Sequence, residues 1–135
     1  AQLARDYASK PVGFLAISSN DTAAYPADAP ESLKEMAREE GFSFPFCHDA
    51  TQVVGLAYTA VATPEFFIFD RDRRLVYRGQ FDDSRPGNDQ PVTGRDVREA
   101  LDVLLVGRPV NQNQKRAVGC SIKWKPGNEP AYLKR

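Results

Sequence analysis

The sequence is poor in the residues that build metal sites and disulfide frameworks. Its 135 residues include two cysteines and one histidine. Cys47 and Cys120 form no CxxC motif, and two cysteines are too few for a disulfide-rich secreted scaffold. His48 cannot complete a zinc site with two distant cysteines unless an acidic residue or water joins them. We therefore expect neither a metal site nor a cofactor in this chain.

The chain also lacks an excess of either charge and any long apolar segment. Lysine plus arginine and aspartate plus glutamate each number 18. This balance argues against a nucleic-acid or membrane-surface role for the chain as a whole. No apolar run approaches the roughly 20 residues needed to span a bilayer, and no signal peptide opens the sequence. The compartment stays open, with the cytoplasm favoured.

What is present is a mixed α/β pattern with enough apolar residues, 41%, for one core. The continuous apolar run at 12–17 predicts a strand buried on both faces of a parallel sheet. Segments 65–69 and 75–79 flank a polar turn and predict a β-hairpin. Helices are predicted at the start of the chain, after a capping Asp28, after a capping Asp49 and Gln52, and along an apolar stripe that ends at Leu105.

Thr63-Pro64, at the start of the first hairpin strand, is the first position with functional content. Proline is tolerated at the first residue of a strand because it cannot donate to the ladder. A cis bond here would leave neighbouring backbone groups free to pair with an extended substrate. From the residues alone an ordinary trans proline is favoured, because only about 5% of such bonds are cis.

Longer motifs carry a family resemblance. They are Val61-Ala62-Thr63-Pro64 before the hairpin, Ile17-Ser18-Ser19-Asn20-Asp21, the segment 82–88 and the segment 119–126. With them, essentially the whole chain resembles the peroxiredoxin-like branch of the AhpC/TSA superfamily of thioredoxin-fold proteins. The resemblance implies a thioredoxin-like α/β mixed sheet flanked by helices over 1–106, an extended basic C-terminal tail over 107–135, and a cis bond at Thr63-Pro64.

The same resemblance implies that one segment of the family pattern is missing. Members carry a first central strand followed by a helix that opens with a CxxC site, and residues 1–10 would be the last turns of that helix. The first strand would lie between the strands at 12–17 and 65–69. Because unpaired strand edges promote aggregation, we expect upstream residues, a separate chain or strand exchange to supply it.

Under this resemblance Cys120 is a candidate resolving cysteine, able to attack a mixed disulfide or a sulfenic acid at the CxxC site. Flanking Lys123 and Lys125 would favour its thiolate. The alternative is that Cys120 is a small residue that helps the tail to dock. Thr63 and Pro64 would shape the substrate site.

Other residues with chemical potential have less specific surroundings. Cys47 departs from the family pattern, which is usually apolar at this position, and we expect a buried thiol there. A disulfide between Cys47 and Cys120 would require Cα atoms within about 7 Å. Asp82, Asp83 and Arg85 could line a ligand pocket, although a loop held by its own salt bridge is the favoured interpretation.

Two functions follow. The first is a thiol-disulfide or peroxiredoxin-like oxidoreductase domain that acts through cysteine redox chemistry in the intact protein, with a thiol or disulfide protein, or a peroxide, as partner. The second is a non-catalytic binding or structural module that keeps the thioredoxin fold. The absence of CxxC supports the second hypothesis directly. Neither involves nucleic acid or a membrane.

Overall fold

The computed structural model describes residues 1–134 as a mixed α/β chain. Its helices are α1 (Gln2–Asp6), α2 (Pro30–Glu39), α3 (Val53–Ala57) and α4 (Arg95–Leu105), with 3-10 turns at Pro26–Asp28 and Ala131–Leu133. The strands are β1 (Ala16–Ser18), β2 (Phe46–His48), β3 (Ala62–Thr63), β4 (Phe66–Phe69), β5 (Leu75–Gly79) and β6 (Cys120–Ser121). No helix in this described range is long and apolar enough to cross a membrane.

The chain divides into two compact units. Unit 1 holds residues 1–60 and the segment from Ile122 onward, and unit 2 holds residues 61–121. Over residues 1–134 the strands pair as three separate two-stranded sheets. The predicted tail over 107–135 therefore contributes to both units instead of forming one of its own.

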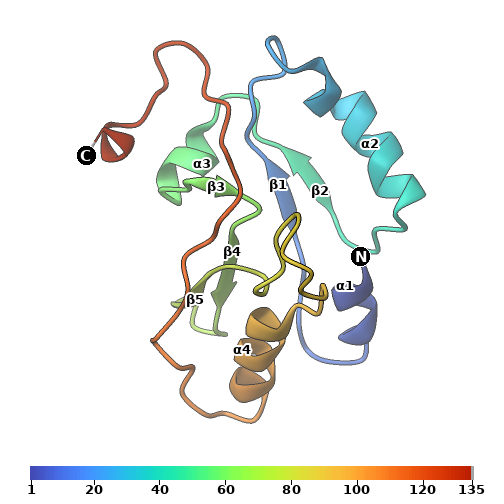
Figure 1. The fold of residues 1–135 in the computed structure, drawn as a ribbon. Coiled ribbons are helices and arrows are strands. Elements are labelled where there is room, and N and C mark those ends of the chain that lie inside the picture. The colour runs from blue at the N-terminus through green and yellow to red at the C-terminus, as the bar shows by residue number, and fades with distance from the viewer. Residues whose placement is uncertain (135) are drawn as a thin grey trace. The chain divides into compact units, whose positions relative to one another are not determined.

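Unit 1 is built on the parallel pair β1–β2, beside which α2 runs (Figure 1). Ala16 pairs with Phe46 and Ser18 with His48. The prediction of a strand over 12–17 that is buried on both faces is wrong. The regular strand is confined to Ala16–Ser18, and Ile17 is 40% exposed. Successive side chains of a strand point to opposite faces, and the face that carries Ile17 is left uncovered.

The predicted side-chain cap of α2 is also wrong. Helix α2 begins at Pro30, whose fixed φ suits the first turn, and its N-cap residue is Ala29. Asp28 instead accepts a hydrogen bond from Asn20 Nδ2 at 3.1 Å through Oδ2. The prediction for α3 holds for one of its two residues. Asp49 accepts a hydrogen bond from the Gly55 amide in the first turn, whereas Gln52 occupies the N-cap with φ +65° and makes no side-chain cap.

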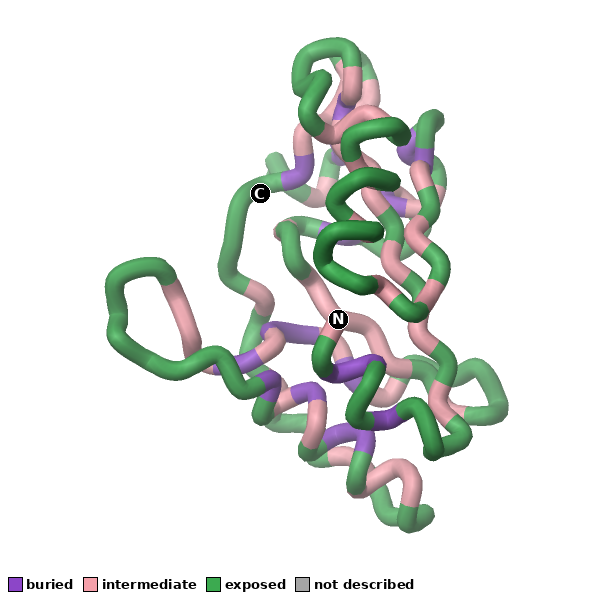
Figure 2. The backbone as a smooth tube through the Cα atoms, turned by 90° about the vertical axis from the view of Figure 1, so that its right-hand side faces the viewer, coloured by how far each residue is buried: buried purple, intermediate pink, exposed green. Residues whose placement is uncertain are grey.

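Unit 2 contains the predicted hairpin and the predicted last helix. β4 and β5 pair antiparallel, with Phe67 opposite Arg78. The apolar stripe of α4 is confirmed, because Val97, Ala100 and Leu101 are buried. Buried residues elsewhere occur in short stretches between exposed ones along the trace (Figure 2).

Candidate functional site

The structure brings Thr63, Pro64 and Cys120 together within unit 2. β3 pairs antiparallel with β6, and the register sets Thr63 opposite Cys120. The Thr63–Pro64 peptide bond is cis. Both Thr63 and Cys120 are exposed. The site is therefore a short two-stranded ribbon at the surface, with a thiol on one strand and the proline after the other.

The backbone of β3 is not free to pair with a substrate, contrary to the expectation from the sequence. The tail already lies against it, and the approach is close because residue 119 is glycine. A Cβ atom on Gly119 would lie 2.2 Å from the carbonyl oxygen of Thr63, a distance that no other side chain permits. The Gly119-Cys120 pair of the tail motif therefore contacts β3 through main-chain atoms.

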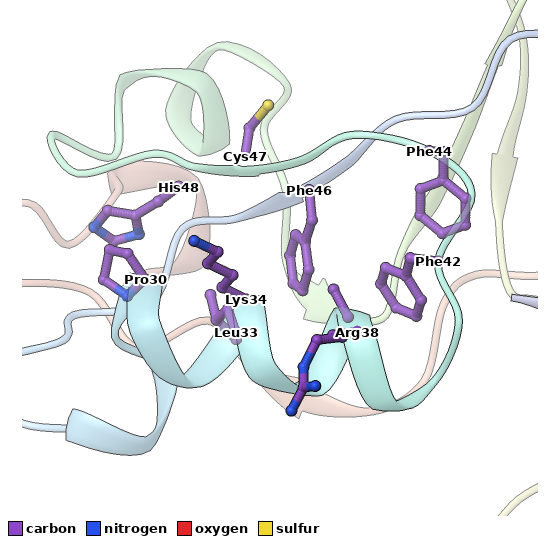
Figure 3. Close-up of a pocket in the computed structure, with 10 residues that line it drawn as sticks. Pro30, Leu33, Lys34, Arg38, Phe42, Phe44, Phe46, Cys47 and His48 are labelled. Atoms are coloured by element: carbon purple, nitrogen blue, oxygen red, sulfur yellow. The ribbon is translucent and has the colours of Figure 1, made fainter.

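Both cysteines are free thiols and both are exposed. The prediction that Cys47 is buried is therefore wrong. Cys47 points away from the side of β2 that carries Phe46 and His48 (Figure 3), as the alternation of a strand requires. Because adjacent strand residues face opposite ways, Cys47 and His48 do not form a nucleophile–base pair.

The lysines expected beside Cys120 are engaged elsewhere. Lys125 Nζ donates to the carbonyl oxygen of Ala50 at 2.6 Å. Lys123 Nζ lies 5.6 Å from the ring centroid of Tyr25, as a cation–π contact. Both contacts belong to unit 1, so these side chains hold the tail and do not serve the thiol.

A groove of about 440 Å³ lies between α2 and β2 in unit 1. Phe42, Phe44 and Phe46 line one part of it, and Lys34 and His48 gather at the other end (Figure 3). Phe42 stacks on Phe44 with the ring centroids 4.7 Å apart, and Phe46 lies tilted against Phe42 with the centroids 5.6 Å apart. The groove is mostly apolar, and its shape follows from the alternating aromatic pattern of residues 42–46.

Asp49, at the end of β2, organises the turn into α3. Its Oδ2 accepts hydrogen bonds from Ser19 Oγ at 2.7 Å and from the Gly55 amide at 2.9 Å. Burial opposes ionisation, but these hydrogen bonds outweigh it and hold the pKa of Asp49 below its usual value. The carboxylate therefore acts as a fixed acceptor that joins β1, β2 and α3.

Asp82 has the same structural role before α4. It is 4% exposed, and its Oδ2 accepts from the amides of Thr93 and Gly94, each at 2.7 Å. Burial opposes ionisation, yet hydrogen bonds from Gly94, Ser84 and Thr93 lower the pKa of Asp82.

The neighbouring acid, Asp83, pairs with cations from outside its own loop. Its carboxylate contacts Arg95 and Lys115, each at 2.7 Å. The hydrogen bond from Lys115, followed by that from Gln80, lowers the pKa of Asp83 to about 2. Arg85 donates to the carbonyl oxygens of Asp82 and Ser84. These residues close the loop, and the salt bridges that we expected within it are made to α4 and the tail.

Sequence reasoning missed the role of Gln52. Its side chain is fully buried and donates to the carbonyl oxygens of Ser19 at 2.7 Å and Lys123 at 2.9 Å. Its Oε1 accepts from the Lys125 amide at 2.9 Å and from Asn128 Nδ2 at 3.0 Å. The partners lie up to 76 residues away, so no local pattern identifies them. The hydrogen bonds of the Gln52 side chain therefore hold the end of the tail in unit 1.

A model of the Redoxin family matches residues 1–97, which is more than half of the chain. The chain belongs to the Redoxin family. This confirms the resemblance to thioredoxin-fold proteins of the AhpC/TSA type, including the α/β fold class. Among curated proteins none matches.

Two solved structures share the fold of this chain and much of its sequence. An uncharacterized conserved protein from Geobacillus kaustophilus is 58% identical over 93% of this chain, with a TM-score of 0.90. A hypothetical protein from Sinorhizobium meliloti is 47% identical over 94% of this chain, with a TM-score of 0.92. The chain spans 66% of the first structure and 69% of the second.

Proposed function

We propose that this chain is the part of a thiol-dependent oxidoreductase that presents a reactive cysteine to a disulfide or sulfenic acid partner. The observation that carries the proposal is the register of β3 and β6, which pairs Cys120 with Thr63 beside Pro64. Cys120 is exposed and has no disulfide partner. A thiol held at the edge of a short ribbon can meet a second sulfur without rearrangement of the core.

The chemistry requires a sulfur centre from outside these residues. The Cys120 thiolate attacks one sulfur of a partner disulfide, a new S–S bond forms, and the other partner sulfur leaves as a thiolate. With a sulfenic acid partner, the Cys120 thiol condenses to the same disulfide and water leaves. A further thiol then reduces this disulfide. In the proposed assembly the dithiol, and the strand that completes the sheet, come from a further segment or a separate chain.

Trapping of the mixed disulfide tests this role. Cys47→Ser leaves Cys120 as the only thiol, and Cys120→Ser leaves Cys47 as a matched exposed thiol. Each variant is mixed with a protein whose CxxC pair is changed to CxxS and whose remaining cysteine is activated as a mixed disulfide with thionitrobenzoate, which leaves as the free thiolate when a second thiol attacks. Covalent complexes are then separated without reductant. The proposal expects a complex that contains the Cys47→Ser chain and little or none with the Cys120→Ser chain.

The competing function is a non-catalytic Redoxin-fold binding module. It is favoured by the absence of CxxC and by the division of the two cysteines between units 1 and 2. Equal trapping of both variants would show that exposure alone governs the reaction, and no trapping of either would favour the binding module. Either result overturns the catalytic role of Cys120.

A further inference from the structure

The groove between α2 and β2 has a charge bias that the chain as a whole lacks. The basic side chains Lys34, Arg38 and His48 line it, and within residues 1–134 no carboxylate side chain does so. The complete sequence has equal numbers of acidic and basic residues, so this one-sided lining is a local property. Because a cleft lined by one sign of charge concentrates ions of the opposite sign, an anionic group suits this groove.

Of the two permanent cations, Lys34 is the one that a ligand can use. Arg38 pairs with Glu35 on the exposed side of α2, and its guanidinium points away from the groove (Figure 3). Lys34 reaches toward His48 instead (Figure 3), and its ammonium group has no hydrogen-bond or ion-pair partner in the described part of the chain. A lysine ammonium carries three donors, which a carboxylate can accept.

His48 adds a polar atom that the chain itself does not pair. Its Nδ1 is buried and has no hydrogen-bond partner among residues 1–134. The adjacent carboxylate of Asp49 is already bound by Ser19 and Gly55. Buried polar atoms of native proteins are nearly always paired, so this nitrogen points to a partner from outside the chain. The imidazole is half-buried and its χ2 torsion is soft, so a turn of the ring can present a nitrogen to a bound anion.

The other end of the groove suits an aliphatic chain better than an aromatic ring. Phe42 stacks on Phe44, and Phe46 is tilted against Phe42. Because the rings pack on one another, they offer a continuous apolar wall and no slot into which a further planar group could be inserted. Leu33 and Ala37 form the facing wall on α2. A flexible alkyl chain can follow such a wall.

We propose that the groove between α2 and β2 binds a medium-chain aliphatic carboxylate. The carboxylate lies between Lys34 and His48, and the alkyl chain lies along the phenylalanine rings. The groove follows α2 from Pro30 to Arg38, roughly 12 Å at a rise of 1.5 Å per residue, a length that extended decanoate can span. Its volume of about 440 Å³ lies in the usual range of small-molecule sites. The site belongs to unit 1 and does not depend on the redox chemistry proposed for Cys120.

The test is a titration of the isotope-labelled chain with octanoate, followed through its backbone amide resonances. Saturable shifts are expected in residues 30–38 and 42–48, and not around Cys120. In a series from hexanoate through octanoate to decanoate, each added methylene group should tighten binding about two- to fourfold, because it removes further apolar surface from water. This series uses the wild-type chain alone and does not depend on how any variant folds.

Two comparisons isolate the contribution of the carboxylate. Lys34→Met keeps a long side chain but removes its charge, and it should weaken octanoate binding about fivefold. Lys10→Met is the matched control, because Lys10 is an exposed lysine of unit 1 that does not line the groove, and it should leave the affinity unchanged. Octanol, which has the same alkyl chain without a charge, should bind the wild-type chain about fivefold more weakly than octanoate and should bind Lys34→Met equally well.

Absence of saturable shifts, or shifts confined to residues outside the groove, would overturn the proposal. Equal affinity of octanoate and octanol, or equal octanoate affinity of the wild-type chain and Lys34→Met, would show a general apolar surface and no carboxylate site. Sedimentation of the chain tests the remaining occupant, since a dimer that excludes octanoate would mean that a second copy fills the groove. Octanoate binding without disulfide trapping of Cys120 would leave this site in place and remove only the redox role.

Discussion

Replacement of Gln52 by leucine should release the end of the tail and destabilise unit 1. Leucine has a similar volume but no polar atoms. The substitution therefore removes two donated hydrogen bonds, to Ser19 and Lys123, and two accepted ones, from Lys125 and Asn128. Because the Gln52 side chain is fully buried, water cannot replace it without repacking of the site.

The expected loss in the free energy of unfolding is about 3–5 kcal/mol. A net hydrogen bond contributes about 1 kcal/mol, and a buried polar group left without a partner costs about 1–3 kcal/mol. The loss in the free energy of unfolding lies at the lower end of this range if the tail detaches and lets water reach Ser19 and Lys125. Since small domains have a total stability of about 5–15 kcal/mol, the effect is large enough for ordinary denaturation experiments.

The only tryptophan of the chain reports on this release. Trp124 packs against α3, where a Cβ on Gly55 would lie 3.2 Å from Trp124 Cη2. Urea titration followed by tryptophan fluorescence and by far-ultraviolet circular dichroism gives the stability, and quenching gives the exposure of the indole. Gln52→Leu should shift the emission to longer wavelength and lower the urea midpoint.

The matched control is Thr51→Ala, an exposed neighbour whose side chain makes none of these contacts. Its stability should remain within about 0.5 kcal/mol of the wild-type value. A loss in the free energy of unfolding below about 1 kcal/mol for Gln52→Leu, together with unchanged emission and quenching, would refute the role of Gln52 in holding the tail.

Two further predictions concern titratable groups of unit 2. Asp82→Asn should lower stability by about 2–4 kcal/mol at neutral pH, because its Oδ2 accepts two amide hydrogen bonds while buried. The pKa of Asp82 is depressed on folding, so its contribution is present above the unfolded value of about 3.9 and is lost as the pH falls below it. The free energy of unfolding should therefore fall less steeply with decreasing pH in the variant than in the wild-type chain. The same acid dependence in both chains would contradict the assignment. Burial, followed by the charge of Asp96, raises the pKa of Tyr77 to about 12. The difference in tyrosinate absorbance between wild type and Tyr77→Phe should therefore appear near pH 12 in the folded chain, and a difference centred near pH 10 would contradict it.

The local pattern of the sequence determined the elements that depend on neighbouring residues. The apolar stripe predicted α4, the polar turn between two β-rich runs predicted the β4–β5 hairpin, and Thr63-Pro64 marked the start of that hairpin. The motifs around these elements indicated the family that the Redoxin match confirms. These features were readable because helix and strand periodicity are properties of short windows.

The tertiary structure alone decided what the polar side chains do. Gln52 resembled a helix-capping residue, yet its partners lie 33 to 76 residues away. Asp28 binds the side chain of Asn20, and Asp82 binds backbone amides 11 and 12 residues away. Cys47 was predicted to be buried because the family pattern is usually apolar at this position, but strand alternation places it on the uncovered side of β2. The position of Cys120 opposite Thr63 follows from the path of the tail, which no periodicity encodes, because a two-residue ladder is set by close main-chain approach at Gly119 and by attachments on either side of it.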